Sequence, residues 1–117
     1  MLNVLDTCPQ KPNCLFRIAI EELEAWFLGD QEAVTRAYPN ANIGVLKNYK
    51  QDSQCGTWEL LMDAISPGFR NNINGSRSQR ILGKKVEFAK KISSHMNVEK
   101  NQSPSFKCFC DGIRKFA

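Results

Sequence analysis

Four acidic side chains lie close together near the start of the chain. Glu21, Glu22, Glu24 and Asp30 fall within ten residues. If this segment is helical, Glu21 and Glu24 share a face, because residues three apart are neighbours on a helix. Converging carboxylates could bind a hard cation such as Mg²⁺, which prefers oxygen ligands. Acidic residues at a helix start are also stabilised by the helix dipole without any metal, so both interpretations stay open.

A lysine in the second half of the chain could complete such a site. Lys85 lies four residues before Ala89 and seven before Ile92, at the edge of the apolar face of a predicted helix. There it could meet a phosphate or a carboxylate from the first half. In the alternative interpretation its aliphatic stem covers the core and its ammonium group stays in water.

Polar side chains surround the start of the last predicted helix. Ser103 followed by Pro104 is typical of a helix N-terminus. The free backbone N–H groups there could bind an anion, with Asn101 and Ser105 beside them. Because the Ser103 side chain satisfies some of these donors, capping is the favoured role.

The elements that would position these groups follow from apolar spacing and from capping residues. Residues 15–20, LFRIAI, alternate in the manner of a short buried strand. Helices are predicted over residues 21–28, from the cap Asp30 to Tyr38, from the cap Thr57 to Ile65, from about Ser78 to Met96, and from Ser103 to Phe116. Residues 40–56 are predicted to form a loop, with a turn of helix near residues 45–49. The fold class is therefore mainly α with at most one or two short strands, in a single domain over residues 1–117.

The apolar residues of these helices predict the core. The helix over residues 78–96 carries an apolar stripe of Leu82, Val86, Ala89, Ile92 and Met96. Trp26 and Trp58 are interpreted as core anchors and not as platforms on which bases stack.

Charge is distributed unevenly along the chain. The net charge is +4, composed of −4 over residues 1–65 and +8 over residues 66–117. A basic second half suggests a nucleic acid or another acidic partner, although the two halves could simply attract each other. The basic series is Arg70, Arg77, Arg80, Lys84, Lys85, Lys90 and Lys91. It would make salt-sensitive phosphate contacts without reading base sequence, and Arg77 and Arg80 are its candidate binding residues.

Several function classes lack their motifs. No GxxxxGK phosphate loop and no GxSxG elbow is present, and His95 is the single histidine. The five cysteines have C-x5-C and C-x-C spacings, which favour ordinary thiols over a zinc site. The chain has no run of eighteen apolar residues and no secretory leader, so we expect a cytoplasmic protein without a membrane span.

Four motifs resemble one known family, in the same order. They are RIAIEELEAWFLGD (17–30), GTWELL (56–61), GKKVEFAKKISSHMN (83–97) and NQSPSFKCFCDGIRKFA (101–117). Together they are similar to DUF4276, a prokaryotic family of unknown function grouped with Toprim-like, Mg²⁺-dependent nucleases. The recurring family positions matched by this chain are Glu22, Glu24, Trp26, Asp30, Lys85, Asn101, Ser103, Ser105 and Phe106.

The resemblance implies a partial α/β Toprim-like domain. Such domains hold Mg²⁺ with an N-terminal glutamate and a later DxD sequence, and neither is present here; the only candidate remnant is Asp6. The chain is therefore expected to match the C-terminal half of the family domain and to lack its N-terminal strands.

Two functional hypotheses follow. In the first, the chain is a truncated nuclease-type domain without autonomous activity, in which Glu22, Glu24 and Lys85 are the catalytic candidates and the two glutamates could bind Mg²⁺. In the second, it is a non-catalytic binding or assembly module whose basic half contacts nucleic acid or a protein, and in which an unpaired strand over residues 15–20 could join another chain.

Overall fold

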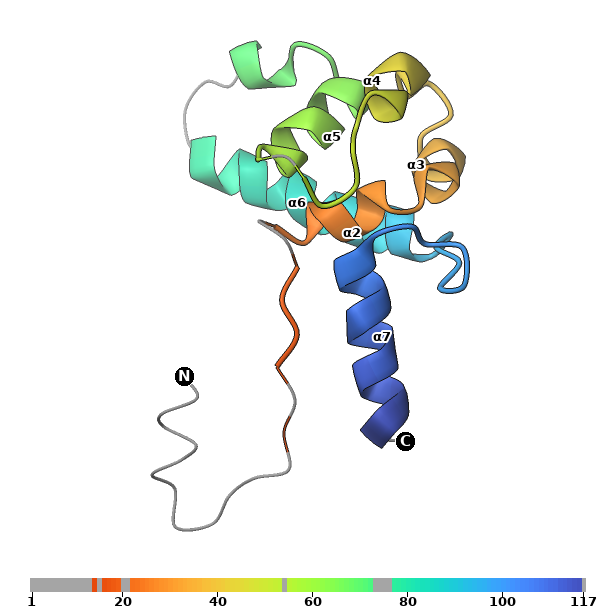
Figure 1. Ribbon diagram of the computed structural model, residues 1–117. Coiled ribbons are helices and arrows are strands. Elements are labelled where there is room, and N and C mark those ends of the chain that lie inside the picture. The colour runs from red at the N-terminus through yellow and green to blue at the C-terminus, as the bar shows by residue number, and fades with distance from the viewer. Residues whose placement is uncertain (1–13, 15, 20–21, 54, 73–76, 117) are drawn as a thin grey trace.

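The computed structural model describes residues 14, 16–19, 22–53, 55–72 and 77–116 (Figure 1). These residues form helices and connecting segments and contain no strand, which confirms the mainly α fold class. The strand predicted over residues 15–20 is wrong for residues 16–19, which have no regular secondary structure; residues 15 and 20 lie outside the described part. Glu21, Asp6, residues 73–76 and the side chain of Arg77 also lie outside it.

The helices follow one another with short connections. In chain order they are α2 (Glu24–Leu28), α3 (Gln31–Ala37), α4 (Ile43–Lys47), α5 (Thr57–Ile65), the 3-10 helix η1 (Phe69–Asn72), α6 (Arg77–Ser93) and α7 (Pro104–Phe116). The predicted helix ending at Met96 is shorter than expected, because the chain turns after Ser93. The segment predicted to be a loop contains α4, whose cap is Asn42: its side-chain oxygen accepts the N–H of Val45.

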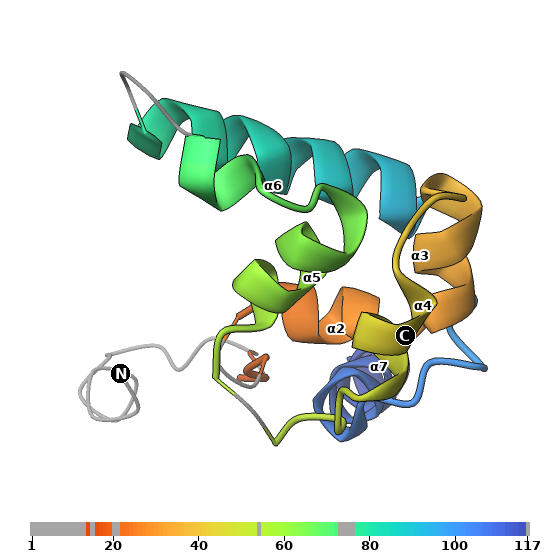
Figure 2. The same ribbon diagram turned by 90° about the horizontal axis from the view of Figure 1, so that it is seen from above.

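The core lies where α2, α3, α5 and α6 meet (Figure 2). Its largest buried apolar side chains are Phe88, Leu28, Leu46, Leu61, Met62, Ile92 and Val34. Trp58 packs against this core as predicted. Trp26 instead packs beside α7, where its ring lies 5.4 Å from that of Phe106 and 4.8 Å from that of Phe109.

The apolar face of α6 differs from the predicted stripe. Phe88 and Ile92 are fully buried, whereas Leu82 is 62% exposed and Val86 is 45% exposed. The buried face is thus rotated from the stripe and includes the half-buried Lys85. Ala89, Ile92 and Met96 of the predicted stripe do pack in or against the core. The spacing rule missed Lys85 because it counts a lysine as polar, whereas carboxylates from a distant segment lie opposite it.

Helix α7 projects from the body, and only its first turns contact α2 (Figure 1). Ile113 and Phe116, on its later turns, are about half exposed. Among the described residues, no helix has the length and apolar character needed to cross a bilayer.

Candidate functional site

Three of the side chains predicted to carry chemistry meet between α2 and α6. Lys85, in the middle of α6, places its ammonium nitrogen 2.9 Å from Oε1 of Glu22 and 3.8 Å from Oε1 of Glu24. Glu22 lies just before α2 and Glu24 begins it. The Glu24 side chain is only 5% exposed, against 25% for Glu22 and 30% for Lys85. We call these residues the carboxylate–lysine cluster.

Glu22 also fixes the start of α5. Its Oε2 accepts the backbone N–H of Trp58 at 3.2 Å and the hydroxyl of Thr57 at 3.3 Å. The prediction that Thr57 caps this helix is wrong, because Thr57 is its first residue and the cap is Gly56, which has no side chain. A carboxylate from a distant segment supplies the missing acceptor, and its charge also suits the helix N-terminus.

A third carboxylate, that of Glu59, contributes to the electrostatics of the cluster. It was not among the candidate residues predicted from the sequence. Glu59 lies in the first turn of α5, and its negative charge helps to keep Lys85 protonated. Its Oε2 atom is buried and has no hydrogen-bond partner in the described part of the chain. The GTWELL motif contains Glu59, but only the fold shows that α5 faces Lys85.

The cluster holds Lys85 in its charged form. Partial burial acts to lower the pKa of Lys85, but the hydrogen bond that Lys85 donates to Glu22 and the charges of Glu24, Glu22 and Glu59 outweigh it and raise that pKa. The ammonium group also lies 5.5 Å from the centre of the Trp58 ring. Lys85 is therefore suited to donate hydrogen bonds or to oppose negative charge, and not to accept a proton.

The cluster does not fit a complete Mg²⁺ site. Mg²⁺ requires near-octahedral oxygen coordination, whereas here an ammonium group lies between the two carboxylates. Both oxygens of Glu22 already accept hydrogen bonds. Within the described residues, no three His, Cys, Asp or Glu side chains are arranged to hold a metal. The role of Glu22 and Glu24 as metal ligands thus stays a prediction.

The cluster forms one wall of an open groove of about 410 Å³. The rest of the lining is mainly apolar and comes from Leu23, Phe27, Val86 and Ala89. Leu23 is 49% exposed there. A molecule entering this groove would meet apolar surface beside three charged groups.

The polar residues around α7 stabilise the fold. Asn101 and Ser103 are fully buried. The Asn101 amide donates to the carbonyl of Trp26 at 2.8 Å and accepts the N–H of Ser103 at 2.9 Å. The Ser103 hydroxyl accepts the N–H of Phe106, as the predicted cap, and the Ser105 hydroxyl accepts the Trp26 indole N–H at 2.9 Å.

An anion does lie at the start of α7, and it belongs to the chain itself. Oδ2 of Asp52 accepts the backbone N–H of Ser105 at 2.7 Å, and both Asp52 oxygens accept the Ser103 hydroxyl. Asp52 has a φ of +53°, which is uncommon for a residue other than glycine. An internal carboxylate thus takes the position in which an external anion was considered.

Asp30 has a similar structural role. One oxygen accepts the N–H of Ala33 at 3.0 Å and so caps α3 as predicted. The other accepts the N–H of Asn97 at 2.8 Å and joins α3 to the segment that follows α6.

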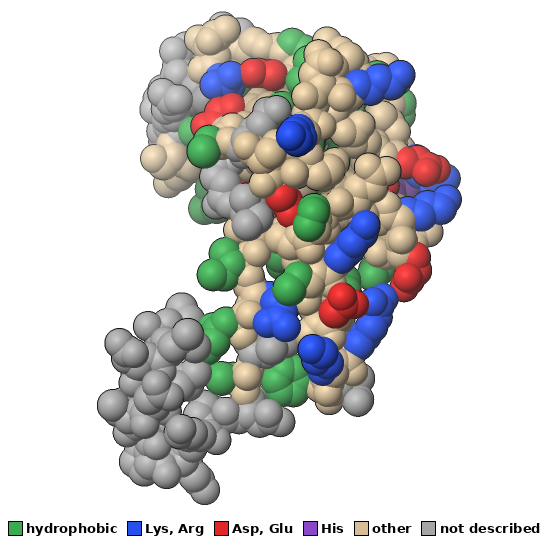
Figure 3. All heavy atoms as spheres, in the orientation of Figure 1, with side chains coloured by type: hydrophobic (Ala, Val, Ile, Leu, Met, Phe, Trp, Pro, Cys, Tyr) green, Lys and Arg blue, Asp and Glu red, His purple; other side chains and the backbone are tan. Residues whose placement is uncertain are grey.

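Of the two candidate phosphate-binding arginines, Arg80 does not line the groove beside the cluster. Arg80 is exposed on α6 and makes no ion pair with a described residue, and the side chain of Arg77 is not described. In Figure 3 the Lys and Arg side chains of the visible face are scattered and do not form one patch. Of the cysteines, Cys14, Cys55, Cys108 and Cys110 are free thiols, and Cys8 lies outside the described residues.

The protein is a mainly helical domain with a carboxylate–lysine cluster in the wall of an open groove. The chain belongs to the family described as "Domain of unknown function (DUF4276)", whose model matches residues 1–114. The match covers essentially the whole chain and not only a C-terminal half, and it includes the N-terminal segment before the four motifs. No curated protein and no solved structure matches the chain.

Proposed function

We propose that this chain is a helical part of a Toprim-like, nuclease-type domain and has no cleavage activity of its own. In this proposal the carboxylate–lysine cluster borders the reaction site, and Lys85 opposes the negative charge of a phosphate group. The remaining metal ligands come from other residues, because the cluster alone does not fit a complete Mg²⁺ site.

One observation carries the proposal. Glu22 and Lys85 are 63 residues apart in sequence, yet they form a hydrogen bond of 2.9 Å in the wall of a groove. Both belong to motifs that resemble the nuclease-related family. A charged group fixed in one orientation is the arrangement that electrostatic stabilisation of phosphoryl transfer requires.

A cleavage assay tests the absence of autonomous activity. The chain would be incubated with supercoiled plasmid and with single-stranded DNA, with Mg²⁺ and with EDTA. We expect no Mg²⁺-dependent cleavage above the level of a mock purification. Cleavage that survives further purification would show that the chain contains a complete site.

A longer member of the family tests the role of the cluster. Changing its lysine aligned with Lys85 to methionine should lower kcat for DNA cleavage by about 100-fold, the usual size of one lost electrostatic contact. The residue aligned with Lys90, which is exposed on the same helix in this chain, is changed in the same way as the control. Unchanged cleavage in the first variant would remove the cluster from the reaction.

A non-catalytic role in binding nucleic acid is the second candidate. It is favoured by Arg80 and Lys90 on α6, which are exposed and form no ion pair with a described residue. Binding through such groups weakens steeply with salt, because each phosphate contact releases a counterion. DNA binding measured at two salt concentrations tests this, and salt-independent or absent binding would exclude it.

A further inference from the structure

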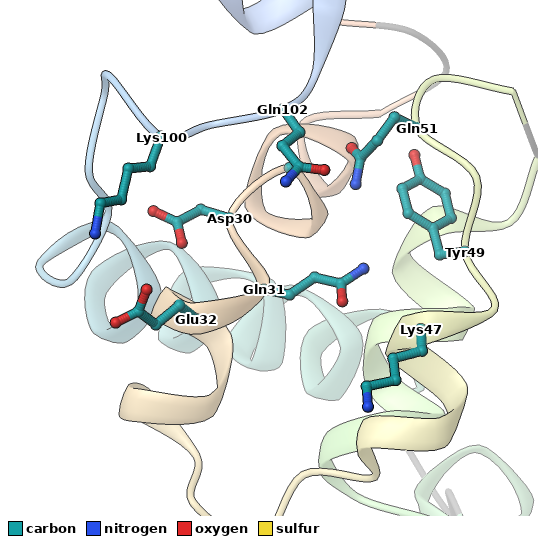
Figure 4. Close-up of a pocket in the computed structure, with 9 residues that line it drawn as sticks. Asp30, Gln31, Glu32, Lys47, Tyr49, Gln51, Lys100 and Gln102 are labelled. Atoms are coloured by element: carbon teal, nitrogen blue, oxygen red, sulfur yellow. The ribbon is translucent and has the colours of Figure 1, made fainter.

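A second cavity lies on the side of the domain where three connecting segments converge. Its volume is about 520 Å³, within the range of about 300–1,000 Å³ that is typical of small-molecule sites. The wall is formed by the α2–α3 junction, the end of α4 with the loop after it, and the segment that precedes α7 (Figure 4). It is separate from the carboxylate–lysine cluster, with which it shares no residue.

The lining of this pocket is rich in primary amides. The amides are those of Gln31, Gln51 and Gln102, and Lys47 and Lys100 lie on opposite sides of the pocket in Figure 4. Each amide can both donate and accept hydrogen bonds, so together they suit a ligand whose edge presents both kinds of group.

Two of the amides are fixed by hydrogen bonds. Nε2 of Gln31 donates to the carbonyl of Leu46 at 2.6 Å, and Nε2 of Gln51 donates to the carbonyl of Leu28 at 3.0 Å. This leaves the oxygen atom of Gln31 as an acceptor for a ligand. Oε1 of Gln51 is buried and has no partner within the described part of the chain, a state that is uncommon in folded proteins.

The acidic groups of the pocket are already engaged. Both oxygens of Asp30 accept backbone N–H groups, and Glu32 forms an ion pair of 2.6 Å with Arg36. In contrast, Lys47 and Lys100 are exposed and make no ion pair with a described residue. The pocket therefore has equal numbers of carboxylates and lysines, and the lysines are the groups that have no ion-pair partner among the described residues.

We infer that this pocket binds one nucleotide unit, with its phosphates at Lys47 or Lys100 and the edge of its base at the glutamine amides. The Gln102 amide can both donate to and accept from the edge of a base, the Gln31 oxygen can accept from it, and lysines contact phosphate. Tyr49 is only 6% exposed and offers little surface for stacking. The inference rests on the proposed function, since a nuclease-type domain acts on nucleic acid, and it adds the place where the strand is held.

Binding of a fluorescent single-stranded 12-mer, followed by anisotropy, tests the inference. Changing Lys47 and Lys100 together to alanine should weaken binding about tenfold and reduce the slope of log K against log salt by about 1.4, at about 0.7 for each phosphate contact on a single strand. The matched pair Arg80→Ala with Lys90→Ala removes the same charge from α6 and should change binding less. If only the α6 pair weakens binding, the inference that this pocket binds a nucleotide is contradicted, whereas binding of nucleic acid by α6 is supported.

A charge-neutral pair of variants tests recognition of the base. Gln102 lines the pocket and its side chain makes no hydrogen bond to a described residue, so Gln102→Ala should leave the fold intact and weaken binding several-fold. Gln79→Ala, on the exposed part of α6, is the control and should have no effect. Equal binding by the two variants would contradict a contact between the pocket and a base.

AMP distinguishes a free nucleotide from a strand. Competition by AMP at the affinity of the 12-mer indicates a site for free nucleotides, and binding of the 12-mer alone indicates a site for a strand. Failure of both probes to bind at millimolar concentration would overturn the inference. This failure leaves the cleavage test above unaffected, so the two proposals are tested separately.

Discussion

The contribution of Lys85 to stability can be predicted from its contacts. Lys85→Met keeps the length of the side chain but removes its charge. Hydrogen bonds to charged groups contribute about 1.5–3 kcal/mol. Because the Lys85 and Glu22 side chains are 30% and 25% exposed, solvent screening lowers that contribution. The substitution also leaves the nearly buried Glu24 with less compensating charge. We therefore expect the free energy of unfolding to fall by about 2 kcal/mol.

Urea unfolding, followed by the fluorescence of Trp26 and Trp58, measures this change. At a chain length of 117 residues, about 2 kcal/mol corresponds to a decrease in Tm of about 8 °C. Lys90→Met is the matched control, since Lys90 is an exposed residue of the same helix, and it should change the free energy by less than about 0.5 kcal/mol.

A double-mutant cycle separates the ion pair from other effects of the substitution. Glu22→Gln combined with Lys85→Met should show a coupling of about 1 kcal/mol, as is usual for residues in direct contact. If Lys85→Met and Lys90→Met have the same free energy of unfolding, or if the coupling energy is zero, the cluster does not stabilise the protein.

Three further predictions concern pH, the α7 cap and two glycines. The pKa of Lys85 is raised above 10.5, so its contribution is fully present below that pH; the stability difference between wild type and Lys85→Met should disappear as the pH rises through the raised pKa. Asp52→Ala removes the acceptor at the start of α7 and should destabilise the protein by about 1–2 kcal/mol in urea unfolding. Gly29→Ala would place a methyl group against the Asn101 side chain and should lower the free energy of unfolding by about 3 kcal/mol. Gly83 has open space around it, so Gly83→Ala should stabilise α6 by about 1 kcal/mol. Thermal unfolding measures both changes.

The parts of the fold that depend on neighbouring residues could be predicted from the sequence. Asp30 and Ser103 cap helices through backbone groups three residues ahead, so their roles are visible in a short stretch of chain. The start of the helix at Pro104 could be predicted for the same reason, because the signal is the adjacent pair Ser103 and Pro104.

The parts that depend on distant residues could not be predicted in this way. Asp52 caps a helix more than fifty residues later, and Glu22 caps α5 from before α2. The buried face of α6 includes Lys85, which becomes favourable there only because Glu22 and Glu24 lie opposite. The family motifs indicated which residues belong to the cluster, but only the fold brought in Glu59.

The attachment of α7 has a consequence for local unfolding. The first turns of this helix contact Trp26 and Asp52, and these contacts are its main attachment to the rest of the protein. Its later turns carry exposed apolar side chains. A segment with so few buried contacts opens with a smaller free energy than the core does. Amide protons in the last turns of α7 should therefore exchange with solvent well before those of α5, and a protease should release the C-terminal end while the remaining helices stay folded.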